Sequence, residues 1–147
     1  AGRQEVPEEL YEIPLGKARV TREGEGLTIV AWGAMVPVVE AAAAKVEKEG
    51  VFPEIIDLMT LAPLDRETIL QSVKKTGRLL IVHEAPKNCG LGAEIAALAA
   101  EKAILQLEAP ILRVTAPDII VPLAKNEDFY YPSPERVVQG IKKIMES

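Results

Sequence analysis

Apolar residues along the chain alternate between short β-type runs and longer segments with helical spacing. Residues 27–32 form a continuous apolar run that Gly33 closes, and such runs are typical of strands covered on both faces. Residues 54–58, 78–83 and 111–115 repeat the pattern, and we expect each to form a further strand. The succession predicts an α/β domain with a mostly parallel, open sheet flanked by helices in three layers.

Helical segments lie between these runs, and most begin or end at a residue that favours a helix terminus. Asp65 and Ser133 are expected N-caps, because their side-chain oxygens can accept from free backbone N–H groups. Gly50 and Gly77 are expected C-terminal stops. The predicted helices run from about residue 36 to 50, from 65 to 75, from 92 to 107, and from 133 to near the C-terminus.

The first part of the chain has a different character, because prolines and glutamates interrupt regular structure there. We expect residues 1–26 to form an entry segment with an edge strand at 15–20. Residues 27–147 then form a single α/β domain, since no repeat, low-complexity stretch or second core is evident.

Composition and charge narrow the functional classes. A hydrophobic content of 48% suffices for a buried core. A net charge of −5 argues against nucleic acid or an anionic membrane as a partner. Cys89, the only cysteine, cannot form an internal disulfide, and no apolar run is long enough to span a membrane. We therefore expect a cytoplasmic protein.

The stretch from His83 to Gly92 gathers the only histidine and the only cysteine beside a glycine loop. His83 and Glu84 should point to opposite faces of a strand, so we expect His83 to close the strand and hydrogen-bond locally. Cys89 lacks a base, and the loop Gly90-Leu91-Gly92 is an incomplete dinucleotide fingerprint. An anion site at the following helix N-terminus is the alternative. We predict no catalytic, cofactor-binding or metal site.

The third predicted helix has two distinct sides. Three glutamates at seven-residue spacing alternate with leucines on one side, and we expect a protein–protein contact made by Glu94, Leu98, Glu101, Leu105 and Glu108. The alternative is that the domain's own loops half-cover this side. The other side should lie against the sheet and carries Ala93, Ala96, Ala97, Ala100, Ala103, Ile104 and Leu107.

Several short motifs occur in an order and spacing typical of one family. They resemble the β subunit of 2-oxoacid dehydrogenase first components, the thiamine-diphosphate enzymes of the pyruvate and branched-chain complexes. The resemblance runs from about Gln4 onward but matches only the second half of that subunit, its transketolase-type C-terminal domain. The motifs are Ile13-Pro14-Leu15-Gly16-Lys17-Ala18, Ala31-Trp32-Gly33, Asp57-Leu58-Met59-Thr60-Leu61-Ala62-Pro63-Leu64-Asp65, His83-Glu84-Ala85-Pro86, Glu108-Ala109-Pro110 and Val114-Thr115-Ala116-Pro117-Asp118.

The resemblance implies a function in which this chain is not the catalytic part. In the family, the preceding pyrimidine-binding domain supplies the glutamate that activates the cofactor, and the α subunit supplies a Gly-Asp-Gly motif for diphosphate and magnesium. No Gly-Asp-Gly occurs here. The complete enzyme uses thiamine diphosphate and Mg²⁺ to decarboxylate a 2-oxoacid oxidatively and pass the acyl group to lipoyl. The resemblance thus implies that this chain binds no cofactor and is inactive alone.

The resemblance also implies partners and a location. The expected partners are the α subunit, a second β subunit and the basic peripheral-subunit-binding domain of the acyltransferase, in the cytoplasm or in a mitochondrial matrix. The motif beginning at His83 looks more like the branched-chain and bacterial versions than the animal pyruvate version. One departure is Met59, where the family usually has arginine, so any ion pair of that arginine is absent here.

Two other interpretations stay open from the residues. The first is a free-standing flavodoxin-like module that binds a small molecule or anion at the loop from Gly90 to Gly92. The second is the equivalent domain of transketolase or of a 2-oxoacid:ferredoxin oxidoreductase.

Overall fold

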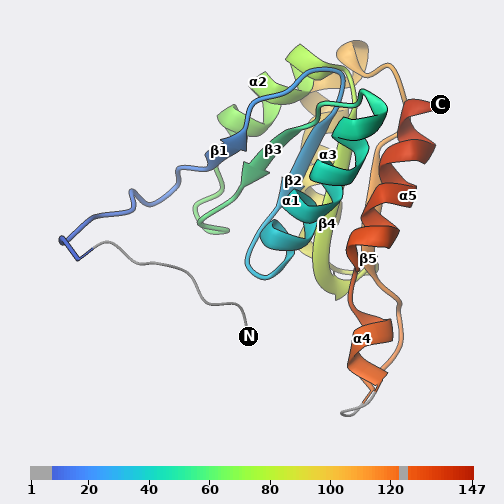
Figure 1. Cartoon of the computed structure of the whole chain (residues 1–147). Helices are drawn as coiled ribbons and strands as arrows, with labels where there is room; N and C mark the ends of the chain where they lie inside the picture. The colour runs from blue at the N-terminus through green and yellow to red at the C-terminus, as the bar shows by residue number, and fades with distance from the viewer. Residues whose placement is uncertain (1–7, 123–125) are drawn as a thin grey trace.

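The computed structural model describes residues 8–122 and 126–147, and within them one five-stranded sheet forms the centre of the fold (Figure 1). The spatial order is β1-β3-β2-β4-β5. β1 runs antiparallel to β3, whereas the other neighbouring pairs are parallel. The strands are β1 (Arg19–Arg22), β2 (Thr28–Ala31), β3 (Glu54–Asp57), β4 (Leu79–Pro86) and β5 (Leu112–Ala116).

Helices cover both faces of this sheet. α1 and α5 contact each other on one face, and α2 and α3 contact each other on the opposite face. The predicted three-layer α/β architecture is therefore confirmed. The helices are α1 (Met35–Val46), α2 (Arg66–Thr76), α3 (Leu91–Ala103), α4 (Glu127–Tyr130) and α5 (Pro134–Met145), with 3₁₀ turns η1 (Glu47–Glu49) and η2 (Ile104–Gln106).

The two central strands explain the continuous apolar runs. Ile29 faces the layer of α1 and α5, and its neighbour Val30 faces the layer of α2 and α3. Leu80 and Ile81 divide in the same way, and all four side chains are fully buried. Burying each such side chain is worth about 1.5–3 kcal/mol. The pattern is apolar at every position because neither face of the sheet is open to water.

Helix termini form where the capping residues predicted them. The Asp65 carboxylate accepts from the Thr68 backbone N–H at 3.1 Å, and the Ser133 hydroxyl accepts from the Arg136 backbone N–H at 3.3 Å. Gly77 ends α2 with a φ of 75°, in the left-handed region that favours glycine. Burial acts to raise the pKa of Asp65, but hydrogen bonds from Ala18 and Thr68 outweigh it and lower that pKa.

Three local details differ from the prediction. α3 ends at Ala103 rather than at 107, and the chain continues as the 3₁₀ turn η2. A tertiary contact explains the early end of α3. The Glu108 N–H donates to the Gly77 carbonyl at 2.8 Å, and this hydrogen bond directs the chain away from the helix. The edge strand runs from Arg19 to Arg22, so it overlaps the predicted range 15–20 only at residues 19–20. The loop before α5 contains the short helix α4, which we did not predict.

The entry segment is tied to the sheet at its second half. The Gly16 N–H donates to the Thr60 hydroxyl and the Ala18 N–H donates to the Asp65 carboxylate, both at 2.9 Å. β1 then pairs with β3, so the residues just before the domain proper close one edge of the sheet. Residues 1–7 of the predicted entry segment lie outside the described residues.

Candidate functional site

The carboxyl ends of β2 and β4 meet at the topological switch point of the sheet. The chain passes from β2 through α1 to β3 on one side, and later returns to place β4 on the other side of β2. α1 and α3, which follow these two strands, lie on opposite faces. Open α/β sheets bind ligands in the crevice that this reversal creates.

In this chain the crevice is filled by two aromatic rings. Trp32 directly follows β2, and its ring stacks on the His83 imidazole of β4 with centroids 5.2 Å apart and planes within 8°. His83 is fully buried and Trp32 is half-buried. The usual ligand position is thus occupied by the protein's own side chains.

The glycine loop seals the imidazole from the other side. A Cβ atom placed on Gly90 would lie 2.6 Å from the His83 Cε1 atom and 2.6 Å from the Pro86 carbonyl oxygen. One placed on Gly92 would lie 2.4 Å from the His83 Nε2 atom. Real side chains do not approach so closely, so these glycines allow the start of α3 to pack directly on the ring. The resemblance to a dinucleotide fingerprint has a packing explanation.

The His83 imidazole is fully buried, which favours its neutral form. Neither of its ring nitrogens has a hydrogen-bond partner among the described residues, so the local hydrogen bond that we predicted is wrong. His83 also does not close the strand, because β4 continues to Pro86. Burial lowers the pKa of His83, and the positive charge of Arg113 lowers it further. Glu84 is exposed, as expected for the opposite face of the strand, and Cys89 is exposed as well.

The predicted sheet-facing side of α3 is only partly correct. Ala103 is buried, and Ala96 and Leu107 are half-buried against the core. Ala93, Ala97 and Ala100 are exposed. The buried side carries Ile95 and Ala99, with Gly92 and Ala103 at the ends of the helix. Ile95 is the large apolar residue of this helix segment, and burying it removes more apolar surface from water than burying an alanine does. Its position therefore sets which side of α3 faces the sheet.

The five residues of the predicted contact do not form one surface. Leu98 is buried with 6% of its surface exposed, so it packs within the domain. Glu108 lies beyond the end of α3 and its carboxylate pairs with the Arg78 guanidinium at 2.7 Å. Glu101 stays exposed, and Leu105 is 90% exposed in η2.

Glu94 at the other end of α3 is also exposed, but it faces α2. Its carboxylate lies 3.5 Å from the Arg66 guanidinium. Ile104, which the sequence analysis had assigned to the sheet side, is 58% exposed beside Leu105. The exposed apolar and acidic group that the structure does assemble is Glu101, Ile104 and Leu105, hereafter the α3 end surface.

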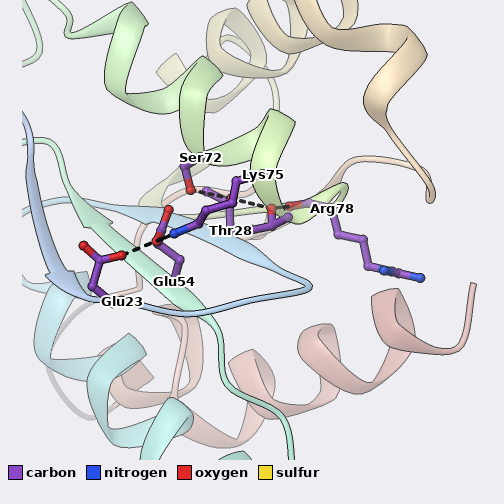
Figure 2. A network of polar contacts seen from close by, with 7 residues as sticks. Glu23, Thr28, Glu54, Ser72, Lys75 and Arg78 are labelled. Carbon is purple, nitrogen blue, oxygen red and sulfur yellow. Dashed lines mark hydrogen bonds and ion pairs between the residues drawn. The ribbon is translucent and has the colours of Figure 1, made fainter.

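A polar network that we did not predict lies at the amino ends of the strands (Figure 2). The buried Glu54 carboxylate pairs with the Lys75 ammonium, which also contacts Glu23 at 3.2 Å. The buried Thr28 hydroxyl lies 2.6 Å from that of Ser72. Burial acts to raise the pKa of Glu54, but hydrogen bonds, above all the one from Lys75, and the positive charge of Lys75 together outweigh it and lower that pKa. The available signal was the glutamate that opens the short strand β3, directly before the apolar pair Ile55 and Ile56.

This network lies beside a cavity of about 910 Å³, at the end of the sheet opposite the switch point. Charged side chains of both signs line it and pair with one another, as Lys75 does with Glu23 and Arg78 does with Glu108. The network therefore satisfies its own charges and serves the fold.

Metal and membrane sites were also sought in the described part of the chain. Within residues 8–122 and 126–147, no three histidine, cysteine, aspartate or glutamate side chains are grouped so that they could hold a metal ion. None of the helices in those ranges is both long and apolar enough to cross a membrane.

Comparison with known families decides the relationship. The model of the transketolase C-terminal domain matches residues 16–137. The chain belongs to the transketolase C-terminal domain family. The match spans every strand of the sheet and reaches into the last helix.

Curated relatives of this transketolase C-terminal domain are β subunits of 2-oxoacid dehydrogenases. The chain is 50% identical over 144 residues to the pyruvate dehydrogenase E1 component subunit beta of Acholeplasma laidlawii, covering 98% of this chain and 44% of that protein. It is 48% identical over 142 residues to the mitochondrial 2-oxoisovalerate dehydrogenase subunit beta 2 of Arabidopsis thaliana, covering 97% and 39%. The chain thus spans less than half the length of these relatives.

Solved structures agree with this assignment. A split-gene transketolase solved as an inactive β4 tetramer superposes with a TM-score of 0.81 at 28% identity, covering 96% of this chain and 46% of that one. A transketolase of Pichia stipitis superposes with a TM-score of 0.60 at 13% identity, which shows a shared fold. The predicted resemblance to a 2-oxoacid dehydrogenase β subunit is confirmed by the curated relatives.

The departure at Met59 has a local consequence in this transketolase C-terminal domain. Met59 follows β3 and is half-buried. The neighbouring Asp57 carboxylate pairs with the Arg19 guanidinium at 3.1 Å and accepts from the Met59 N–H at 3.2 Å. The strand end therefore keeps a charged contact, which is supplied from β1.

Proposed function

We propose that this chain acts as the C-terminal domain of the β subunit of a thiamine-diphosphate-dependent 2-oxoacid dehydrogenase. The observation that carries the proposal is the match of 98% of the chain, at 50% identity, to 44% of a pyruvate dehydrogenase β subunit. Relatives named for 2-oxoisovalerate match nearly as well. The substrate class is therefore a 2-oxoacid, either pyruvate or a branched-chain one.

Within that enzyme we assign the domain to assembly. The switch point is filled by the Trp32–His83 stack, and a buried, neutral imidazole is a poor ligand for a diphosphate. The residues at the switch point therefore do not fit the diphosphate of the cofactor. In the whole enzyme, thiamine diphosphate with Mg²⁺ supplies the carbanion chemistry of decarboxylation, held by the pyrimidine-binding domain and the α subunit.

Of the predicted contact we retain Glu101 and Leu105, which form the α3 end surface together with Ile104. Ile104 is 58% exposed and Leu105 is 90% exposed, so both can bury apolar area against a partner. Glu101 beside them would favour a basic partner and steer its approach. The partners we propose are the α subunit, a second β subunit and the basic peripheral-subunit-binding domain of the acyltransferase. The location would be a bacterial cytoplasm or a mitochondrial matrix.

Turnover by the isolated chain tests the division of labour. The purified chain is incubated with thiamine diphosphate, Mg²⁺ and either pyruvate or 2-oxoisovalerate, and release of CO₂ is measured. We expect none, whereas the intact Acholeplasma laidlawii dehydrogenase serves as the positive control. Release of CO₂ by the chain alone would contradict the proposal and favour a self-sufficient enzyme.

A further inference from the structure

A groove beside β5 is lined by four positively charged side chains. It has a volume of about 370 Å³ and lies along β5, the edge strand, where α5 flanks it. Its cations are Lys87 from the loop after β4, Arg113 from β5, and Arg136 and Lys143 from α5. Asp118 is the one carboxylate in the lining. We call this set the basic groove.

The two arginines are held in place by backbone oxygens. The Arg113 guanidinium donates to the Lys87 carbonyl at 2.9 Å. The Arg136 guanidinium donates to the Thr115 carbonyl at 2.5 Å and to the Tyr130 carbonyl at 3.2 Å. A carbonyl oxygen carries only a partial negative charge, so these contacts orient the guanidinium groups without neutralising them.

The charge of the basic groove is not compensated by ion pairs within the described residues. The ion pairs found there use other cations, and none involves the four that line the groove. Asp118 offsets one of the four charges and accepts from the Asn88 N–H at 2.7 Å. The chain as a whole carries a net charge of −5. A positive cleft on an acidic protein concentrates anions locally.

The shape of the groove suits a small ligand. α5 lies close to the strand at its centre, because a Cβ on Gly140 would come within 2.8 Å of the Val114 Cγ2 atom. Val114 and Gly140 both line the groove, so this contact forms part of its base. Its volume falls in the range of small-molecule sites, about 300–1,000 Å³.

We propose that the basic groove binds a small phosphate-bearing anion of pyrophosphate or nucleotide size. Guanidinium groups match the geometry of phosphate oxygens, and flexible ammonium groups add point charges to them. Arg113 and Arg136 would form the fixed part of the site. Lys87 and Lys143, which are both exposed, would close on the ligand. The site is separate from the switch point and does not depend on the proposed function.

Calorimetric titration of the purified chain with pyrophosphate and with ATP tests this proposal. At low ionic strength we expect binding of at least one of the two, and weaker binding as salt is added. Lys87→Gln and Lys143→Gln should each weaken it by about tenfold, the loss expected for one charge-assisted hydrogen bond. Both side chains are exposed, so thermal unfolding of these variants should match the wild type.

The matched control is Lys142→Gln. Lys142 neighbours Lys143 in α5, but its ammonium pairs with Glu49 at 2.8 Å and is not part of the groove lining. The affinity of the Lys142→Gln variant for pyrophosphate or ATP should stay within about twofold of the wild type, because this substitution removes a charge only at long range from the groove. An equal loss in this variant would reduce the effect to bulk electrostatics and overturn the site.

Two further outcomes would overturn the proposal. One is the absence of binding of both pyrophosphate and ATP at millimolar concentration. The other is binding of a polyglutamate peptide more tightly than pyrophosphate with the same dependence on Lys87 and Lys143, which would assign the groove to an acidic protein segment.

Discussion

Gly92→Ala should destabilise the domain through a single contact. The new methyl group would lie 2.4 Å from His83 Nε2, 2.6 Å from His83 Cδ2 and 3.3 Å from Ile81 Cγ2. The imidazole has no room to move, because it is fully buried and stacked on Trp32. Overpacking of this kind costs about 1–3 kcal/mol, against a helix-propensity gain of at most about 1 kcal/mol for alanine. With the full gain subtracted, we expect a net loss of up to about 2 kcal/mol.

Urea and thermal unfolding followed by circular dichroism measure that loss. For a domain of this size, each kcal/mol should lower Tm by about 2–4 °C. The double variant with His83→Ala isolates the contact, because removing the ring creates the missing space. Gly92→Ala should then cost at least about 0.5 kcal/mol less than in the wild-type background.

Gly50→Ala is the matched control for this cycle. Gly50 has a φ of 83° and a Cβ there would meet nothing within 4 Å, so its cost is one of backbone conformation alone. That cost should be the same with or without His83. If Gly92→Ala stabilises the domain, or costs the same in both backgrounds, the packing explanation of the glycine loop is refuted.

Three further predictions concern charge. Burial and a nearby cation lower the pKa of His83, so the folded state favours the neutral ring. The free energy of unfolding of the wild type should therefore fall as pH drops below about 6.5, and that of His83→Gln should fall less. Urea unfolding at several pH values measures this, and an equal dependence on pH in the two proteins would contradict it. Glu54→Gln should lower the free energy of unfolding by about 1–3 kcal/mol, because it removes the charge of a buried carboxylate that pairs with the half-exposed Lys75. Glu67→Gln on the exposed face of α2 should change it by less than about 0.5 kcal/mol, and equal effects would argue against the network. Glu101→Lys combined with Leu105→Ala should weaken binding to the α subunit in a salt-dependent way, and unchanged affinity by calorimetry would remove the α3 end surface from the contact.

The elements of the fold were predictable from sequence because their causes are local. Ile29 and Val30 lie in a run that must be buried on both sides, whatever surrounds it. Asp65 and Ser133 cap helices through contacts only three residues away. Such signals operate within a few residues, so the order and type of the elements follow from the chain itself.

The predicted contact surface depended on longer-range causes and was only partly correct. The end of α3 is set by a hydrogen bond between Glu108 and Gly77, which lie thirty-one positions apart in the chain. The spacing of residues within one helix cannot predict such a contact. The buried side of the helix follows Ile95, and Leu98 lies with it in the interior. The prediction of the buried side followed the alanines of the helix and neglected these two large side chains.

The candidate site around His83 likewise needed three dimensions. From the sequence we grouped His83 with its neighbours in the chain, whereas in the structure it stacks on Trp32, which follows β2. The basic groove has the same origin, because Lys87, Arg113 and Arg136 come from separate segments that only the sheet order brings together. Residue type alone could not have revealed either arrangement.

A chimera tests most directly whether this chain is the assembly domain of a 2-oxoacid dehydrogenase β subunit. In it, this chain replaces the matching part of the Acholeplasma laidlawii β subunit, and the product is expressed together with the α subunit of that enzyme. Light scattering and CO₂ release measure assembly and turnover, with the unmodified and the truncated β subunits as controls. We expect the chimera to assemble with the α subunit and to decarboxylate the 2-oxoacid, and the truncated subunit to do neither. A soluble, folded chimera that stays apart from the α subunit, while the unmodified subunit assembles, would contradict the assignment.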